Sequence, residues 1–131
     1  MSGDRRAGWH EFDIDGFEVF IGRSARDNDE LTFRVARPRD IWLHAAGHAG
    51  SHVVIRVPDE ADEVPRQVLE RAAAWAAWHS KARNARGKVD VHYCRAAEVR
   101  KPRGVPAGTV ELRRFHTVRV YPRAATVTDD S

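Results

Sequence analysis

The stretch IWLHAAGHAGSHVVIRV, residues 41–57, holds two apolar runs separated by Gly47 and Gly50. Ile41–His44 predicts a short strand, and Ser51–Val57, rich in β-branched residues, predicts a buried one. The two glycines break the chain between these runs, which indicates a turn at the edge of a sheet.

A hairpin is predicted upstream of this stretch. The runs Trp9–Ile14 and Phe17–Gly22 flank the pair Asp15-Gly16. This pair is typical of a two-residue hairpin turn, because both of its central residues need a positive φ. The alternating apolar positions of the second run would then share one face.

Two helices are expected. Ser24 and Asp27 have the spacing of a capping box, which predicts a short helix over about 25–36. A longer helix is predicted over about 65–86, because Pro65 suits a helix start and Gly87 suits the residue just after a helix end. Apolar residues recur between them at helical spacing.

The C-terminal part predicts more strands. Lys88–Tyr93 alternates like a strand, and Arg100–Gly108 is a basic loop rich in glycine and proline. Thr109–Phe115 and Thr117–Tyr121 predict two further strands, which we expect to pair. The whole order predicts an α+β domain with a single mixed or mainly antiparallel sheet, backed by one long helix and a short helix.

A length of 131 residues suits one domain, expected over residues 9–123, with disordered ends at 1–8 and 124–131. The one cysteine, Cys94, excludes an internal disulfide and a thiolate-rich zinc site, and an inert packed thiol is expected. No apolar run is long enough to cross a bilayer and the N-terminus has no secretory pattern, so a cytoplasmic location is expected.

Positive charge is concentrated in one part of the chain. Residues 79–123 hold 12 Lys and Arg against 3 Asp and Glu, a balance of +9. The rest of the chain holds 10 against 16, a balance of −6, so the total is +3. A basic half favours polyanions such as phosphate backbones, although a solvated cationic surface would give the same pattern.

Polar side chains cluster around the glycine-containing turn. Asp40, Trp42, His44, Ser51 and His52 bring together an acid, a large ring, two imidazoles and a hydroxyl. Backbone N–H groups in such a turn can hold phosphate, and Trp42 could stack on an unpaired base. Alternatively, Trp42 and one histidine are core residues at the end of a strand.

The same cluster permits two other interpretations. His44, His48 and His52 are spaced by four, which would place a zinc site on one face of a helix, but the two glycines argue against a helix here. As an enzyme, Asp40 would orient His44 or His52 as a base, with Ser51 as nucleophile. No recognised catalytic glycine motif accompanies these residues, and no metal or cofactor is expected.

A second group of residues is basic and lies in the C-terminal half. Pro102 and Gly104 would keep its loop extended and adaptable, so its side chains would project into solvent. The group is the main phosphate-binding candidate and consists of Lys81, Arg83, Arg86, Arg100, Lys101 and Arg103.

Several motifs occur in a fixed order from about residue 16 to residue 123. They are Gly22-Arg23, Asn28-Asp29, Asp40–His44, Gly50–Ile55, His79–Arg83, Val99–Gly104 and Thr117–Pro122. This ordered series resembles the RNA-binding (NFACT-R) domain of the NFACT ribosome-quality-control proteins.

The resemblance implies an RNA-binding domain that contacts tRNA or rRNA through a basic surface and acts in translation or ribosome-associated quality control. The large ribosomal subunit is an implied partner, and no membrane is. A nucleic-acid-processing enzyme and a protein-interaction module with an acidic partner are the alternatives. Site residues carried over by position are Arg23, Asn28, Asp29, Trp42, His44, Ser51, His52, Lys101 and Arg103.

Overall fold

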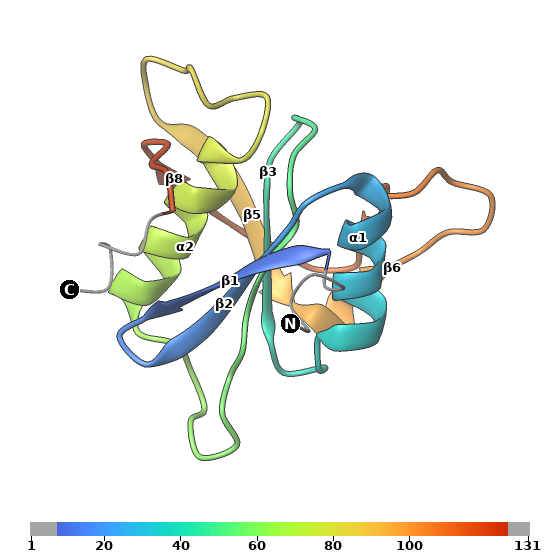
Figure 1. Ribbon diagram of the computed structural model, residues 1–131, viewed down its shortest axis with the longest axis horizontal. Coiled ribbons are helices and arrows are strands. Elements are labelled where there is room, and N and C mark those ends of the chain that lie inside the picture. The colour runs from blue at the N-terminus through green and yellow to red at the C-terminus, as the bar shows by residue number, and fades with distance from the viewer. Residues whose placement is uncertain (1–7, 126–131) are drawn as a thin grey trace, which may run out of the picture.

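Six strands form one antiparallel sheet in this computed structural model, which describes residues 8–125 (Figure 1). Their order across the sheet is β1-β2-β4-β3-β5-β8, and a two-stranded sheet pairs β6 with β7. The bounds are β1 Trp9–Ile14, β2 Phe17–Gly22, β3 Ile41–Ala45, β4 Val53–Ile55, β5 Val89–Arg95, β6 Val99–Arg100, β7 Glu111–Leu112 and β8 His116–Val120.

The predicted α+β class with a mainly antiparallel sheet is confirmed, while the small second sheet was not predicted. Disorder was predicted for residues 1–8 and 124–131. Of these, residues 1–7 and 126–131 lie outside the described residues. Within the described part, no helix combines the length and the apolar character needed to cross a membrane.

The tight hairpin is as predicted. β1 and β2 pair so that Ile14 lies opposite Phe17, which leaves a two-residue turn. Asp15 has a φ of 51° and Gly16 a φ of 92°, so both central residues take the left-handed conformation that this turn requires. The side chain of Val19 on β2 is fully buried, as its alternating position predicts.

The predicted pairing of Thr109–Phe115 with Thr117–Tyr121 is wrong. β7 turns back on β6, and β8 pairs with β5 instead. In that register Val118 lies opposite Val91, and both are buried. A pairing between the two sequence neighbours would not bring these valines together, so burial of apolar side chains favours the longer-range pair.

Two short helices flank the sheet. Six residues of α1 continue directly into five residues of a π-helical turn, η2, eleven in all, and α2 has thirteen residues. The side chain of Ser24 caps α1 by accepting a hydrogen bond from the backbone N of Asp27. The helical bounds are α1 Ala25–Glu30, η2 Leu31–Val35, α2 Arg66–Trp78 and the 3-10 turn η3 Ala96–Glu98.

The prediction of one long helix to residue 86 is wrong, because α2 ends at Trp78. Directly after it, Ser80 forms a β-bridge with Gly50. The backbone N of Ser51 also donates to the carbonyl of His79, at 2.8 Å. This pairing with a distant loop replaces the hydrogen bonds that would have continued the helix.

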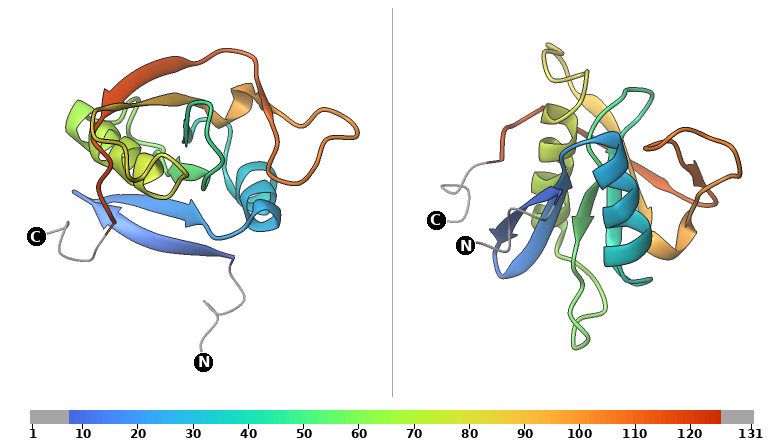
Figure 2. Two further views of the ribbon diagram at one scale, coloured as in Figure 1. Left: turned by 90° about the horizontal axis from the view of Figure 1, so that it is seen from above. Right: turned by 45° about the vertical axis from the view of Figure 1, so that its right-hand side comes forward.

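The helices cover opposite faces of the sheet (Figure 2). Leu43, Val53 and Val91 point toward α2 and join its alanine-rich face in the larger core. Trp42 and Val54, one position along the strands, point the other way and pack with residues of η2 in a smaller core. The period of two along each strand therefore separates a structural face from the face that carries the site.

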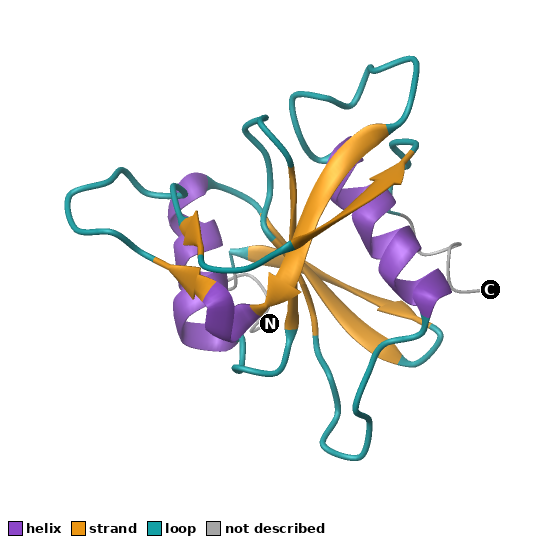
Figure 3. Ribbon diagram, turned by 180° about the vertical axis from the view of Figure 1, so that it is seen from behind, coloured by secondary structure: helices purple, strands orange, loops and turns teal. Residues whose placement is uncertain are grey.

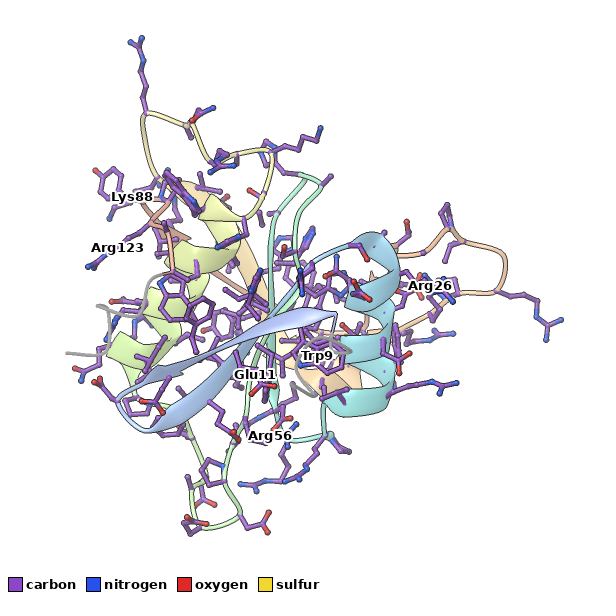
Figure 4. All side chains as sticks on the ribbon, viewed as in Figure 1. Trp9, Glu11, Arg26, Arg56, Lys88 and Arg123 are labelled. Carbon is purple, nitrogen blue, oxygen red and sulfur yellow. The ribbon has the colours of Figure 1, made fainter. Side chains whose placement is uncertain are left out.

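Asp40 anchors the start of β3 from a fully buried position. Its carboxylate accepts hydrogen bonds from the backbone N of Arg37 at 2.9 Å and from the backbone N of Val57 at 3.0 Å. It also binds Nε of Arg56 at 3.0 Å, a side chain labelled in Figure 4 that is 15% exposed. One carboxylate thus links the segment before β3 to the segment after β4.

We expect Asp40→Asn to lower the free energy of unfolding by about 3 kcal/mol, because it leaves the Arg56 charge without its buried partner. Urea denaturation measures this decrease. Asp90→Asn is the matched control: its pair with Arg119 is 54% and 70% exposed, and its effect should stay below about 1 kcal/mol. Equal decreases in the two variants would contradict the anchoring role.

Candidate functional site

A cleft of about 1070 Å³ lies where the β3–β4 loop, the end of α2 and the loop before β7 meet. That loop, residues 101–110, extends beyond the two-stranded sheet at the left of Figure 3. Eight of the predicted site residues line the cleft: Arg23, Asn28, Trp42, His44, Ser51, His52, Lys81 and Arg83. Their segments are far apart in the sequence, so the fold brings together much of what the motifs predicted.

Gly50 makes the close approach that closes one side of the cleft. A Cβ at this position would lie 2.6 Å from Cβ of Ser80 and 2.9 Å from the carbonyl O of His79. The backbone N of Lys81 donates to the carbonyl of Ala49 at 2.9 Å. These contacts hold Lys81 beside the segment that contains Ser51.

His52 is almost fully buried at the floor of the cleft. Trp42 Nε1, which can only donate, binds Thr32 Oγ1 at 3.1 Å, so the Thr32 hydroxyl hydrogen is free to bind His52 Nδ1 at 2.7 Å. His52 Nε2 then donates to the carbonyl of Gly108 at 3.2 Å. The neutral imidazole with its proton on Nε2 satisfies every group in this chain of hydrogen bonds.

Trp42 therefore has a structural role. Only 1% of it is exposed, its Nε1 is hydrogen-bonded within the core, and its ring packs edge-on against His52 at 5.0 Å between centroids. The alternative that placed Trp42 and one histidine in the core agrees with this geometry. Its ring supports the floor of the cleft and has no free face for a base.

Asn28 links α1 to the same floor. Its Oδ1 accepts from the backbone N of His52 at 3.1 Å, and its Nδ2 donates to the carbonyl of Gly50 at 3.3 Å. A Cβ at Gly22 would lie 1.8 Å from Asn28 Oδ1, so the amide needs a glycine beside it. Asn28 thus positions the turn that carries His52.

Lys101 and Asp29 clamp the projecting loop onto α1. Lys101 Nζ lies 2.9 Å from Asp29 Oδ2 and donates to the carbonyls of Pro106 at 2.7 Å and Thr109 at 2.9 Å. The other Asp29 oxygen accepts from the backbone N of Gly108 at 3.0 Å. An ammonium group has three donors, so these contacts use all of them. We therefore assign Lys101 to holding the loop that supplies the carbonyl acceptor of His52.

The remaining basic candidates fall into two groups. Arg100 is paired with Glu111 at 3.4 Å, and neither Arg86 nor Arg103 lines the cleft. In contrast, Arg23 and Lys81 are exposed at the cleft and have no carboxylate partner within residues 8–125.

Arg83 completes the free cations of the cleft. Its guanidinium carbon lies 4.7 Å from the centroid of the Trp78 ring, and no carboxylate pairs with it among the described residues. The cleft lining, within that same part of the chain, contains no aspartate or glutamate. The arrangement therefore offers three cationic groups without an internal counter-charge, which suits a polyanion.

Burial favours the neutral form of three histidines in the cleft lining. Burial lowers the pKa of His52 to about 4, helped by the neighbouring His44. Burial also lowers the pKa of His44 and of His92, which lines the cleft next to His44. His92 was missed as a site residue, although its alternation with Val91 along β5 could have placed it on this face.

The contacts of Asp40 do not support the enzymatic interpretation, in which it would orient His44 or His52. The two Asp40 oxygens accept hydrogen bonds from Arg56 and from the backbone N–H groups of Arg37 and Val57, at the start of β3. His44 lies near the other end of that strand.

For the zinc interpretation, the described residues contain no group of three or more His, Cys, Asp or Glu that could hold a metal ion. His48 lies outside the cleft lining. Burial raises the pKa of the Cys94 thiol to about 12, as expected for an inert packed thiol.

We expect the stability of the protein to fall between pH 7 and pH 5, in part because of His52. Its pKa is about 4 in the folded state and about 6.5 in the unfolded state, so the unfolded state binds more protons in this range. This group alone should remove about 2 kcal/mol at pH 5. Urea denaturation at pH 7 and pH 5 measures the decline in the free energy of unfolding. That decline should be smaller in His52→Gln than in the wild type by about 2 kcal/mol. Equal declines in His52→Gln and in the control His48→Gln would contradict the assignment of this effect to His52.

Comparison with known proteins extends this picture. Residues 8–114 match the family described as NFACT protein RNA binding domain. The chain is 44% identical over 112 residues to the Rqc2 homolog RqcH of Bacillus subtilis (strain 168), covering 86% of this chain and 19% of that protein. It is 30% identical over 87 residues to the Ribosome quality control complex subunit NEMF homolog of Drosophila melanogaster, covering 66% of this chain and 9% of that protein.

A solved structure is similar as well. The C-terminal part of the fibronectin/fibrinogen-binding protein from Streptococcus suis superimposes with a TM-score of 0.82 at 33% identity, covering 94% of this chain and 48% of that one. The chain spans about a fifth or less of the length of the two curated relatives above. Because the family match takes in every residue that lines the cleft, and most of the chain besides, this chain belongs to the family of NFACT RNA-binding domains.

Proposed function

We propose that this chain binds RNA at the cleft, with Arg23, Lys81 and Arg83 contacting phosphates. The observation that carries the proposal is the set of three exposed cations around a lining without carboxylates in the described part of the chain. Phosphate contacts supply most of the affinity of proteins for nucleic-acid backbones. Membership of a family described by RNA binding supports the same ligand.

We further propose that the bound RNA is tRNA or rRNA and that binding occurs during ribosome-associated quality control, in the cytoplasm. The support is the relative named as a subunit of the ribosome quality control complex, which matches two thirds of this chain. The large ribosomal subunit is then the partner on which the domain acts. No contact described above favours an enzymatic step, so the proposal is one of binding.

Residues that shape the cleft have a different role from those that contact phosphate. Asn28, Asp29, Trp42, His52 and Lys101 are occupied by internal hydrogen bonds or ion pairs. In the proposed complex these side chains hold the floor and one wall in place. Removal of any of them would weaken binding by disordering the cleft.

We expect Arg23→Gln combined with Lys81→Gln to weaken RNA binding and to make it less sensitive to salt. Removing one phosphate contact lowers the slope of log K against log salt by about 0.7 on single strands and about 0.9 on a duplex, so the pair should lower it by about 1.4 to 1.8. Fluorescence anisotropy with labelled tRNA and rRNA fragments over a series of salt concentrations measures the slope.

The matched control is Arg34→Gln combined with Arg66→Gln, which removes the same charge. These two side chains are exposed, lie outside the cleft lining and pair with Glu30 and Glu70. Their replacement should leave the slope unchanged. The proposal fails if both double variants lower the slope equally, or if no RNA binds the wild-type chain at low salt.

A further inference from the structure

Three strands carry a row of side chains across the face of the sheet that η2 leaves uncovered. His44 on β3 lies directly opposite His92 on β5, and His92 lies opposite Thr117 on β8. The smaller core stops one step before this row, at Trp42 and Cys94. The row itself is open: the two histidines are half-buried and Thr117 is exposed.

Aromatic rings pack against one another along this row. The ring of His44 stacks on Trp42 at 5.8 Å between centroids, with 19° between the planes. The ring of His92 lies 4.1 Å from that of Phe115, which is 47% exposed although it is a large apolar side chain. We call His44, His92 and Phe115 the ring row. Phe115 is exposed and the two histidines are half-buried, and accessible aromatic side chains on and beside a sheet are the arrangement on which unpaired bases stack.

Two members of the ring row, His44 and His92, lie beside the free cations, whereas Phe115 lies outside the cleft lining and contacts the ring of His92. His44 and His92 line the same cleft as Arg23, Lys81 and Arg83. Burial lowers the pKa of both imidazoles and so favours their neutral form, which leaves charge recognition to the cations. The cleft volume of about 1070 Å³ is at the upper end of what small-ligand pockets offer, which leaves room for a base together with its sugar and phosphate.

We propose that the ring row stacks on the bases of a single-stranded RNA segment whose phosphates contact the cations of the cleft. This inference rests on the proposed RNA-binding function and adds the form of RNA that is recognised. A base-paired helix keeps its bases stacked inside, so it cannot offer their faces to the ring row. The domain therefore prefers a loop or an unpaired end of a larger RNA.

The test uses a labelled single-stranded RNA of about eight nucleotides, a length typical of stacking-type sites, and the same strand with abasic residues at its centre. Both probes have equal numbers of phosphates. Wild-type protein should bind the abasic probe at least about fivefold more weakly. A probe with 2-aminopurine at the centre should lose fluorescence when bound, because its base becomes stacked.

Phe115→Ala and His92→Ala should each weaken binding of the intact strand at least about fivefold, with an unchanged salt slope and little effect on the abasic probe. Phe115→Trp should bind the intact strand as the wild type does, because it keeps an aromatic ring at this position. Tyr121→Ala is the matched control: its side chain is 62% exposed, but its ring contacts Lys88 and not a member of the ring row.

The outcomes separate the two proposals. Equal affinity for the intact and abasic probes, or unchanged affinity in both Phe115→Ala and His92→Ala, would overturn stacking on the ring row and leave phosphate binding standing. Tighter binding to a duplex than to the single strand would overturn it as well. Failure of every probe to bind at low salt would reject the RNA-binding function itself.

Discussion

The contact between Gly50 and Ser80 is the constraint on which the site depends. It needs a residue without a side chain, because a Cβ at Gly50 would meet the backbone of Ser80 at 2.8 Å. This approach ends α2, and it brings the cations after that helix to the turn that carries His52. Without it the cleft would lack one wall, although the two hydrophobic cores on either side of the sheet would remain.

Local patterns predict the elements of this fold better than they predict its partners. The Asp15-Gly16 hairpin and the helix cap at Ser24 follow from neighbouring residues, so they are visible in the sequence. The end of α2 is not visible, because Lys81, Ala82 and Arg83 favour helix by themselves and only a bridge to residue 50 overrules them. For the same reason β8 could not be assigned to β5 from its sequence.

The candidate site shows the same division. Motifs along the chain identify many of the residues that line the cleft, but they do not distinguish a side chain that faces a ligand from one that holds the wall. Lys101 is the clearest example, since a lysine in a basic loop suggests phosphate, whereas its three donors bind Asp29 and two carbonyls. Which cations lack a partner depends on side chains distant in sequence, so the sequence alone leaves it open.

The hydrogen bonds of the loop that closes the cleft have a consequence for synthesis. The ring of His52 is hydrogen-bonded to the carbonyl of Gly108, 56 positions later in the chain. The carboxylate of Asp29 accepts from the backbone N of Gly108, 79 positions later. Both contacts need residue 108, so they form only after most of the chain has been made, whereas the hairpin needs only neighbouring residues. During translation the cleft therefore stays incomplete until Gly108 has left the exit tunnel, whereas the first hairpin can close as soon as it emerges.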